Sequence, residues 1–418
     1  MTPRTRIPGS AFHRYPMVLA IVAFGISAMP LHAQSEERDP SIADLPRQGY
    51  EPRTVRLGAT VIQPSLALDM SYDDNIFADR SIRAGDTVVN VQPRILAGRS
   101  TANLDLRADA HAALTRYALN PRENVDSFGV NIRGTIRGEK RALVVAAAFD
   151  RTFERRSDPE ASTDRSRSPA LINLATGDLQ YRYEGTRIGI KAKLAVVKLD
   201  YLPAVDADRD FVTYRASVRG LFSIGRRMAV FVEPFANRRD AKLAVDRSGF
   251  DRDTTTAGAL AGVAFDLTGK LDGDIGIGVF RSNPDDRSLR AFTGLAANGR
   301  IVWRPQTRTA ITVAFFRGDV MTNRLGALGR VDTRLSLTID QEARHNLTLH
   351  ARIASRKVHY RGSDNSDQRY LSCEGEARYL LNRSLALVFN ATYSRRNADD
   401  PSERYYRWQT TGGVRLTY

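Results

Sequence analysis

The sequence predicts an all-β protein, an up-and-down antiparallel transmembrane β-barrel of about eighteen strands, with sixteen as the alternative count. Three observations support this fold class. Apolar and polar residues alternate with a period of two through most of the chain after residue 65. Short and long connections alternate between these segments, and the last segment ends on an aromatic residue. A soluble β-sandwich is the competing interpretation.

The N-terminus has the pattern of a secretory signal peptide over residues 1–33. Three arginines precede an apolar segment (17–29), and the small residue Ala33 marks the expected cleavage site. The apolar segment is shorter than the roughly 20 residues that a membrane-spanning helix needs. A buried helix or a short anchor is the alternative, but the pattern favours export of the chain.

The rest of the chain is expected to form two parts. Residues 34–64 are polar and contain prolines, which predicts a periplasmic N-terminal extension. Residues 65–418 carry the alternating pattern and are expected to form the barrel. The barrel is therefore expected to occupy most of the mature chain.

Composition limits the classes of function. The formal net charge is +15, and loss of the three arginines of the signal peptide leaves +12. A GC-rich genome would explain the arginine content, whereas affinity for polyanions is the functional alternative. No nucleic-acid-binding signature is present, so an exported protein would meet lipopolysaccharide or acidic polysaccharide. The single cysteine, Cys373, excludes an internal disulfide and a multi-cysteine metal site.

The alternating segments have the length of membrane-crossing strands. They run to roughly 10–14 residues, whereas sandwich strands are nearer five or six. The clearest segments are 102–117, 127–138, 187–199, 330–340, 346–355, 384–394 and 405–418. Short connections such as 184–187 alternate with long ones such as 154–170. Outer-membrane barrels have this asymmetry, with short periplasmic turns and longer external loops.

The polar phase of the strands is charged, which suits a hydrated lumen better than the outer face of a sandwich. Acidic residues (Asp69, Asp105, Asp332 and Glu376 among them) lie between the basic ones. A predominantly basic lining would favour anionic solutes. The residues predicted to line a pore are Arg107, Arg133, Arg137, Lys191, Lys193, Arg215, Arg219, Arg334, Arg352, Arg378 and Arg415.

The last strand alternates out to the terminal Tyr418. It resembles the C-terminal strand signal by which bacterial outer-membrane proteins engage their assembly machinery. Tyr418 is therefore the expected assembly signal, and that machinery an expected partner.

The segment 50–78 resembles the start of the family named putative β-barrel porin type 2. The resemblance rests on Tyr50 and Pro52, Gly58, Pro64-Ser65, and a strand ending of Tyr72, Asp73, Asp74, Asn75, Ile76 and Phe77. Ala59-Thr60 replaces the aromatic residue that usually follows the glycine. The resemblance implies a barrel in the outer membrane of a Gram-negative cell. Some relatives are similar to components of exopolysaccharide systems, and the resemblance transfers no catalytic residues.

The aspartates at this strand ending have three interpretations. Similar clusters occur at 206–210, 283–287, 363–367 and 397–401, all in connections expected on the outer side. Asp and Asn end strands through local hydrogen bonds. Carboxylates at the outer rim could instead bind divalent cations. A catalytic pair is the weakest interpretation, because adjacent strand residues point to opposite faces.

No catalytic motif, cofactor site or metal site is predicted. Of the histidines, His111 and His350 fall in the lumen phase and His345 in a periplasmic turn. The expected function is that of a porin-like passive channel with a net basic lumen, which passes small anionic or neutral solutes or serves the export or anchoring of an acidic exopolysaccharide. A non-conducting structural or adhesive barrel is the alternative, and a hydrolase at the outer rim is the weakest candidate. The expected surroundings are outer-membrane lipid and lipopolysaccharide, and the pattern does not define an oligomeric state.

Overall fold

The computed structural model describes residues 42, 45–162, 164–247, 249–320, 322, 324, 327–362 and 367–418. The signal peptide predicted at 1–33 lies outside these residues, as do residues 34–41, 43 and 44 of the extension predicted at 34–64. Among the described residues, no helix has the length and apolar character needed to cross a membrane.

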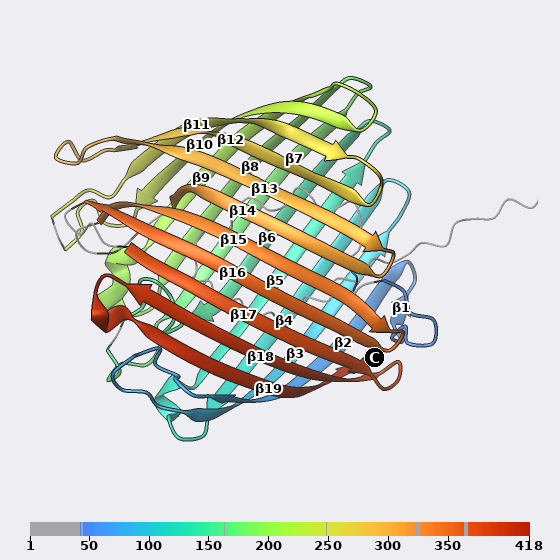
Figure 1. The fold of residues 1–418 in the computed structure, drawn as a ribbon, viewed down its shortest axis with the longest axis horizontal. Coiled ribbons are helices and arrows are strands. Elements are labelled where there is room, and N and C mark those ends of the chain that lie inside the picture. The colour runs from blue at the N-terminus through green and yellow to red at the C-terminus, as the bar shows by residue number, and fades with distance from the viewer. Residues whose placement is uncertain are drawn as a thin grey trace, which may run out of the picture.

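Nearly every described element is an antiparallel strand, as the period-two pattern predicts (Figure 1). The strands are β1 (Val55–Leu57), β2 (Thr60–Asp73), β3 (Asp86–Ser100), β4 (Leu104–Tyr117), β5 (Val125–Arg137), β6 (Arg141–Phe153), β7 (Leu171–Glu184), β8 (Ile188–Tyr201), β9 (Phe211–Ser223), β10 (Met228–Ala241), β11 (Thr254–Asp266), β12 (Leu271–Pro284), β13 (Phe292–Gln306), β14 (Thr309–Val320), β15 (Ala327–Arg344), β16 (Leu347–Gly362), β17 (Asp367–Leu380), β18 (Leu385–Ala398) and β19 (Tyr405–Thr417). Short 3₁₀ helices occur at η2 (Pro121–Glu123), η3 (Ala204–Arg209) and η4 (Pro401–Glu403).

The sheet closes on itself because the last strand pairs with the first long one. β19 pairs with β2 in antiparallel register, with Gly413 opposite Asp69. The ring β2–β19 therefore contains 18 strands, which confirms the predicted fold class and count. β1 adds a short pairing with β2 beyond the end of β19, with Val55 opposite Ile62. The first barrel strand begins at Thr60, earlier than the predicted start at residue 65.

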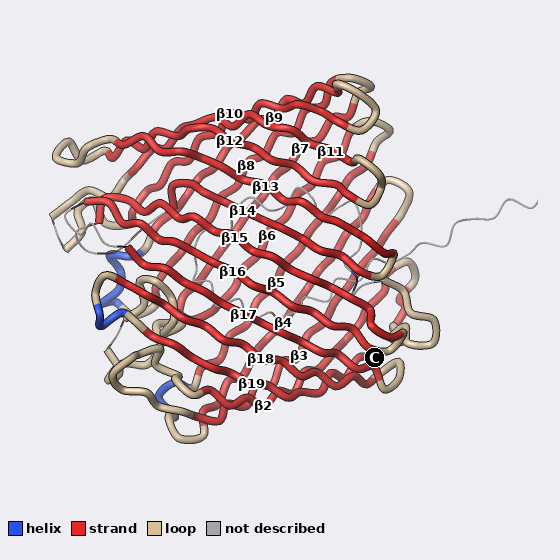
Figure 2. The backbone as a smooth tube through the Cα atoms, in the orientation of Figure 1, coloured by secondary structure: helices blue, strands red, loops and turns tan. Residues whose placement is uncertain are grey.

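The two ends of the barrel differ in the length of their connections. The long loops and all three described 3₁₀ helices gather at one end, and the short turns lie at the other end with the C-terminus (Figure 2). Turns such as 138–140 and 307–308 contrast with loops such as 154–170 and 242–253. The end with the long loops is called the outer end below.

The alternation separates an apolar outer surface from a polar interior. On β4, Leu106 and Leu114 are exposed on the outside, whereas Asp105, Arg107 and Asp109 lie in the opposite phase. Apolar side chains are also buried in the outer half of the interior. Clusters of buried apolar side chains form there, one of them from Ala170, Ile172, Leu199, Tyr201 and Phe211.

Candidate functional site: the lumen and its inward loop

The loop 154–170, which joins β6 to β7, extends across the lumen to the strands on the far side of the ring. At its tip, the carboxylate of Glu160 pairs with Arg330 of β15 at 2.6 Å. Gln368 of β17 donates a hydrogen bond to the carbonyl of Pro159 (3.4 Å), and Arg396 of β18 donates one to the carbonyl of Asp158 (3.2 Å). These contacts of residues 158–160 with β15, β17 and β18 are called the latch below.

The base of this loop is pinned by ion pairs to three neighbouring outer connections. Arg156 pairs with Glu123 at 2.7 Å, and Arg167 pairs with Asp206 at 2.7 Å. Arg165 pairs with a carboxylate of the β2–β3 connection, and Arg209 pairs with Glu154 of the loop itself. The loop is therefore held from both ends, which favours one defined path across the lumen.

Asp158 in the latch is a buried carboxyl group. Its Oδ2 accepts a hydrogen bond from the backbone N–H of Arg155 at 3.1 Å. Its Oδ1 is buried and has no hydrogen-bond partner among the described residues. Burial raises the pKa of Asp158 to about 6 and Glu154 adds to the rise, whereas Arg155 and Arg356 oppose it. The latch therefore contains a group that changes charge in mildly acidic solution.

The outer ends of β14 and β15 also bend into the interior. Pairing between β13 and β14 reaches only Ala297 opposite Arg317, so the outer ends of these two strands are separate. The hydroxyl of Thr256 on β11 donates a hydrogen bond to Asp319 of β14 at 2.8 Å. In a regular wall these strands would lie about 14 Å apart, three spacings of about 4.8 Å. The bent hairpin and the loop 154–170 together narrow the outer half of the lumen.

The Asp73-Asp74-Asn75 motif fastens the seam between β2 and β19 at the outer end. Asp73 is 1% exposed, and its carboxylate pairs with Arg407, with Nε and Oδ1 2.9 Å apart. The carboxylate of Asp74 accepts a hydrogen bond from the N–H of Trp408 at 2.8 Å. The N–H of Asp74 donates in turn to the carbonyl of Trp408 at 3.1 Å. The motif therefore ends a strand and also joins the first and last strands of the barrel.

Asn75 extends this arrangement to the inward loop. Its side-chain amide donates to the carbonyl of Asp79 at 2.8 Å, and its Oδ1 accepts from the N–H of Asp79 at 3.2 Å. The carboxylate of Asp79 pairs with Arg165, whose guanidinium lies 5.2 Å from the centre of the Phe77 ring. The motif thus shapes a connection that holds the loop 154–170.

Three of the other outer aspartate clusters form ion pairs and turns, and residues 363–366 of the fourth lie outside the described residues. Asp208 pairs with Arg247 at 2.8 Å and Asp285 with Arg238 at 2.7 Å, while Asp400 accepts a hydrogen bond from the N–H of Ser402 at 2.8 Å. No group of three or more potential metal-ligating residues occurs within the part of the chain that the structure describes.

All eleven predicted pore-lining residues lie in the phase opposite to the exposed apolar side chains. Ion pairs between described residues join at least six of them to carboxylates of the same interior phase. The pairs are Arg107–Asp105 (3.0 Å), Arg137–Asp105 (3.6 Å), Arg219–Glu233 (2.6 Å), Arg334–Asp332 (2.6 Å), Arg378–Glu376 (3.2 Å) and Arg415–Asp69 (2.5 Å). For these six positions, the local charge is compensated rather than basic.

The lumen-phase histidines also contact carboxylates. His111 lies between Asp109 (3.4 Å) and Asp150 (3.3 Å), and His350 lies 2.7 Å from Asp340. The structure thus places these histidines in polar networks of the lining.

Residues 47–50 contact the end of the barrel that carries the short turns, which is called the periplasmic end below. Arg47 is buried and pairs with Glu342 of β15 at 3.2 Å. His345 in the β15–β16 turn lies 2.9 Å from the carbonyl of Gln48, and its ring meets the ring of Tyr50 edge-on at 5.8 Å. Residues 47–50 therefore contact β15 and the β15–β16 turn at this end.

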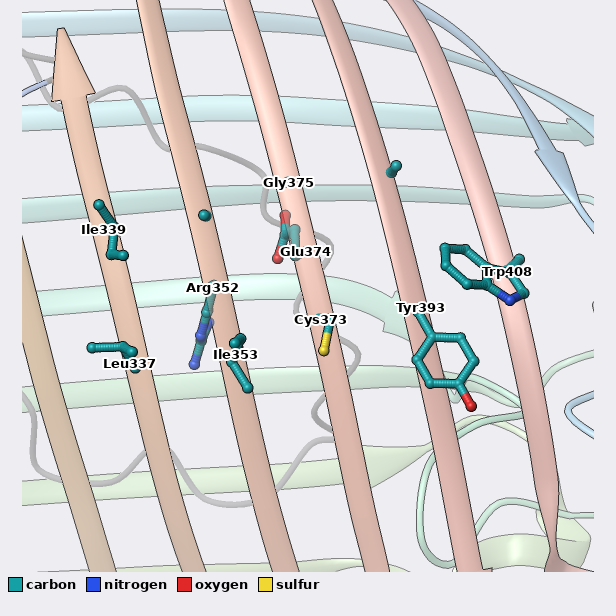
Figure 3. A pocket seen from close by; sticks show the side chains of 11 residues that line it. Leu337, Ile339, Arg352, Ile353, Cys373, Glu374, Gly375, Tyr393 and Trp408 are labelled. Atoms are coloured by element: carbon teal, nitrogen blue, oxygen red, sulfur yellow. The ribbon is translucent and has the colours of Figure 1, made fainter. Parts of the chain in front are cut away.

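A shallow apolar groove of about 230 Å³ lies on the strands β15–β19 (Figure 3). Leu337, Ile339 and Ile353 lie on one side, and Tyr393 and Trp408, whose rings are 4.9 Å apart, lie on the other. These side chains belong to the outward phase, so the groove lies on the apolar outer surface, and Arg352 and Glu374 of the interior phase also contribute to its lining.

A closed, up-and-down barrel with an apolar outside and a charged interior defines an outer-membrane β-barrel protein. The family model described as "Putative beta-barrel porin 2" matches residues 48–418, and the chain belongs to this family. The resemblance noted in the sequence is thereby confirmed. The protein is a porin-like barrel of the bacterial outer membrane.

Solved barrels that are similar to the chain share little sequence with it. OpdL of Pseudomonas aeruginosa is 13% identical, with 87% of this chain and 99% of that chain covered and a TM-score of 0.44. OccAB3 of Acinetobacter baumannii is 9% identical, with 87% and 100% covered and a TM-score of 0.45. The FrpB iron transporter of Neisseria meningitidis, F5-1 variant, is 9% identical, with 90% and 84% covered and a TM-score of 0.46. No curated protein matches the chain.

Proposed function

We propose that this protein is a passive diffusion channel for small hydrophilic solutes, narrowed in its outer half by the loop 154–170. The observation that carries the proposal is the latch, because it places a loop across the lumen of an 18-strand barrel. Barrels of this size leave an aqueous channel unless loops fold inward. An inward loop therefore sets an upper limit on the size of the solute.

The same loop bears on the polysaccharide alternative. A polymer chain would have to pass the latch, including the buried pair of Glu160 with Arg330, whose side chains are 12% and 5% exposed. Breaking such contacts for each passing chain is costly, since an unpaired buried arginine loses the interaction that offsets its desolvation. Small solutes are therefore the better match than an exopolysaccharide.

Anions are the preferred class of small solute in this proposal. Several lining arginines have carboxylate partners, and on the wall formed by β7, β8 and β9 the cations Arg182, Lys191, Lys193, Arg215 and Arg219 lie close together. A local excess of positive charge favours anion entry in a pore of low dielectric surroundings. Catalysis forms no part of the proposal.

Planar-bilayer recording of the refolded full chain tests this function. We expect discrete conductance steps in KCl and, in a salt gradient, a permeability ratio of chloride to potassium above one. A ratio below one would overturn the anion preference. Absence of steps from the wild type and from a variant with the latch removed would overturn the channel itself and favour a structural or adhesive barrel.

A further inference from the structure

The inner wall formed by β7, β8 and β9 (Figure 1) gathers basic side chains around Lys193. In the strand register, Lys193 lies opposite Gln180 on β7 and Ser217 on β9. The next interior position on β8 towards the periplasmic end is Lys191, which lies opposite Arg182 and Arg219. In the other direction, Ala195 lies opposite Asp178 and Arg215. Directly opposed side chains have Cβ atoms about 5 Å apart and diagonal ones about 7–8 Å, so four cationic side chains surround Lys193 at contact range for long side chains.

The neighbours of Lys193 are compensated to different degrees. Arg219 is 3% exposed and lies 2.6 Å from Glu233 and 2.9 Å from Asp274, so its charge is balanced locally. Arg182 lies 3.4 Å from Glu184. These two arginines therefore have carboxylate partners of their own.

The ammonium group of Lys193 differs from both. Its Nζ is buried and has no hydrogen-bond partner among the described residues. Three carboxylates lie near it, but each is shared with arginines. Asp178 interacts with the charges of Arg133 and Arg215, and Glu233 and Asp274 accept hydrogen bonds from Arg219. A buried ammonium without an acceptor is costly, and like charges around it raise the cost further.

We propose that Lys193 is the centre of an anion-binding subsite on this wall, which takes a small oxyanion such as a carboxylate or phosphate. An oxyanion would supply the acceptor that Lys193 lacks among the described residues. Guanidinium groups suit this class of ligand because they bind carboxylate and phosphate in a planar, bidentate manner. In the strand register, the side chains between the cations at Ala195 and Ser217 are short. The subsite rests on the proposed function, because it names the chemistry that a diffusing solute would meet.

Single-channel recording in about 0.1 M KCl tests the subsite, since higher salt would screen it. The probes are gluconate, inorganic phosphate and the neutral sorbitol. We expect gluconate or phosphate to reduce the KCl current in a saturable manner and sorbitol to have little effect. Lys193→Gln should raise the half-blocking concentration at least about tenfold, as expected for loss of a charge-assisted hydrogen bond. Block by gluconate alone identifies a carboxylate subsite, and block by both oxyanions a general one.

Lys198→Gln is the matched control, because Lys198 lies on the same strand but on the exposed outer phase. Gluconate and phosphate should block the Lys198→Gln channel at the same concentrations as the wild type. Equal block of wild type and Lys193→Gln, or equal effects of sorbitol and gluconate, would overturn the subsite while leaving the channel intact. If the wild type does not conduct, the proposed function fails, and calorimetric titration of the detergent-folded protein decides the subsite. Gluconate or phosphate binding that Lys193→Gln weakens supports it, and no binding or equal binding overturns it.

Discussion

Removing the carboxylate of Glu160 should release the latch and enlarge the channel. This group accepts hydrogen bonds from Arg330 at 2.6 Å and from the hydroxyl of Thr322 at 2.9 Å. The bond from a charged donor contributes roughly 1.5–3 kcal/mol and the neutral one roughly 0.5–1.5 kcal/mol. Glu160→Ala should therefore weaken docking of the loop tip by about 3 kcal/mol. Since about 1.4 kcal/mol corresponds to a tenfold change, the ratio of undocked to docked loop should rise about 100-fold.

Bilayer recording measures this change directly. We expect Glu160→Ala to show larger or more frequent open levels than the wild type and to admit larger neutral solutes. Glu139→Ala is the control, because it removes the same kind of side chain from an exposed position in a periplasmic turn, away from the loop 154–170. If Glu160→Ala and the wild type have the same conductance and the same size limit, then the loop does not restrict the lumen.

Three further predictions follow from the same contacts. Docking of the loop raises the pKa of Asp158 to about 6, so the docked loop takes up a proton on acidification. The equilibrium constant for docking should therefore rise up to about tenfold per pH unit as the pH falls from about 6 to about 4, and this gain is lost as the pH rises through 6. Conductance should therefore fall in acid for the wild type and lose this dependence in Asp158→Asn; an unchanged pH profile in the variant would refute the assignment. Asp73→Ala should lower the free energy of unfolding by about 3 kcal/mol, because it removes the buried carboxylate that pairs with the partly buried Arg407. Urea unfolding with a wild-type midpoint would contradict this. Asn75→Ala should increase conductance less than Glu160→Ala does, since it loosens only the connection that presents Asp79 to Arg165; no change relative to wild type would separate the motif from the loop.

The barrel itself could be predicted from the sequence because its signals are local and repeated. A period of two fixes which residues face inward, and the alternation of loop lengths fixes the direction of each hairpin. The strand expected at 384–394 is found at Leu385–Ala398, so its start agrees to within one residue and its outer end extends further. The first barrel strand begins at Thr60 and not at residue 65. The expected start was late because Pro64, which indicates a strand start in the sequence, lies inside the strand. Pro64 still accepts a hydrogen bond through its carbonyl, from the N–H of Tyr418 at 3.1 Å.

The candidate site was less predictable because it depends on contacts between distant segments. The alternating pattern predicts that the eleven basic residues face the interior, but it does not show that carboxylates of the same phase, such as Glu233 and Asp274, pair with them. Reading both charges on facing strands would have revealed the compensation of Arg219. The direction of the loop 154–170 had no comparable signal, since the pairing of Glu160 with Arg330 spans 170 residues. The roles of Tyr418 in assembly and of residues 1–33 as a signal peptide stay predictions.

The most direct test of the account is the single-channel behaviour of the refolded wild type beside Glu160→Ala, recorded in a KCl gradient with neutral solutes of graded size. The account predicts that both proteins conduct, that both favour chloride over potassium, and that the variant admits larger solutes. Failure of both to conduct, or an identical size limit for the two, would contradict it.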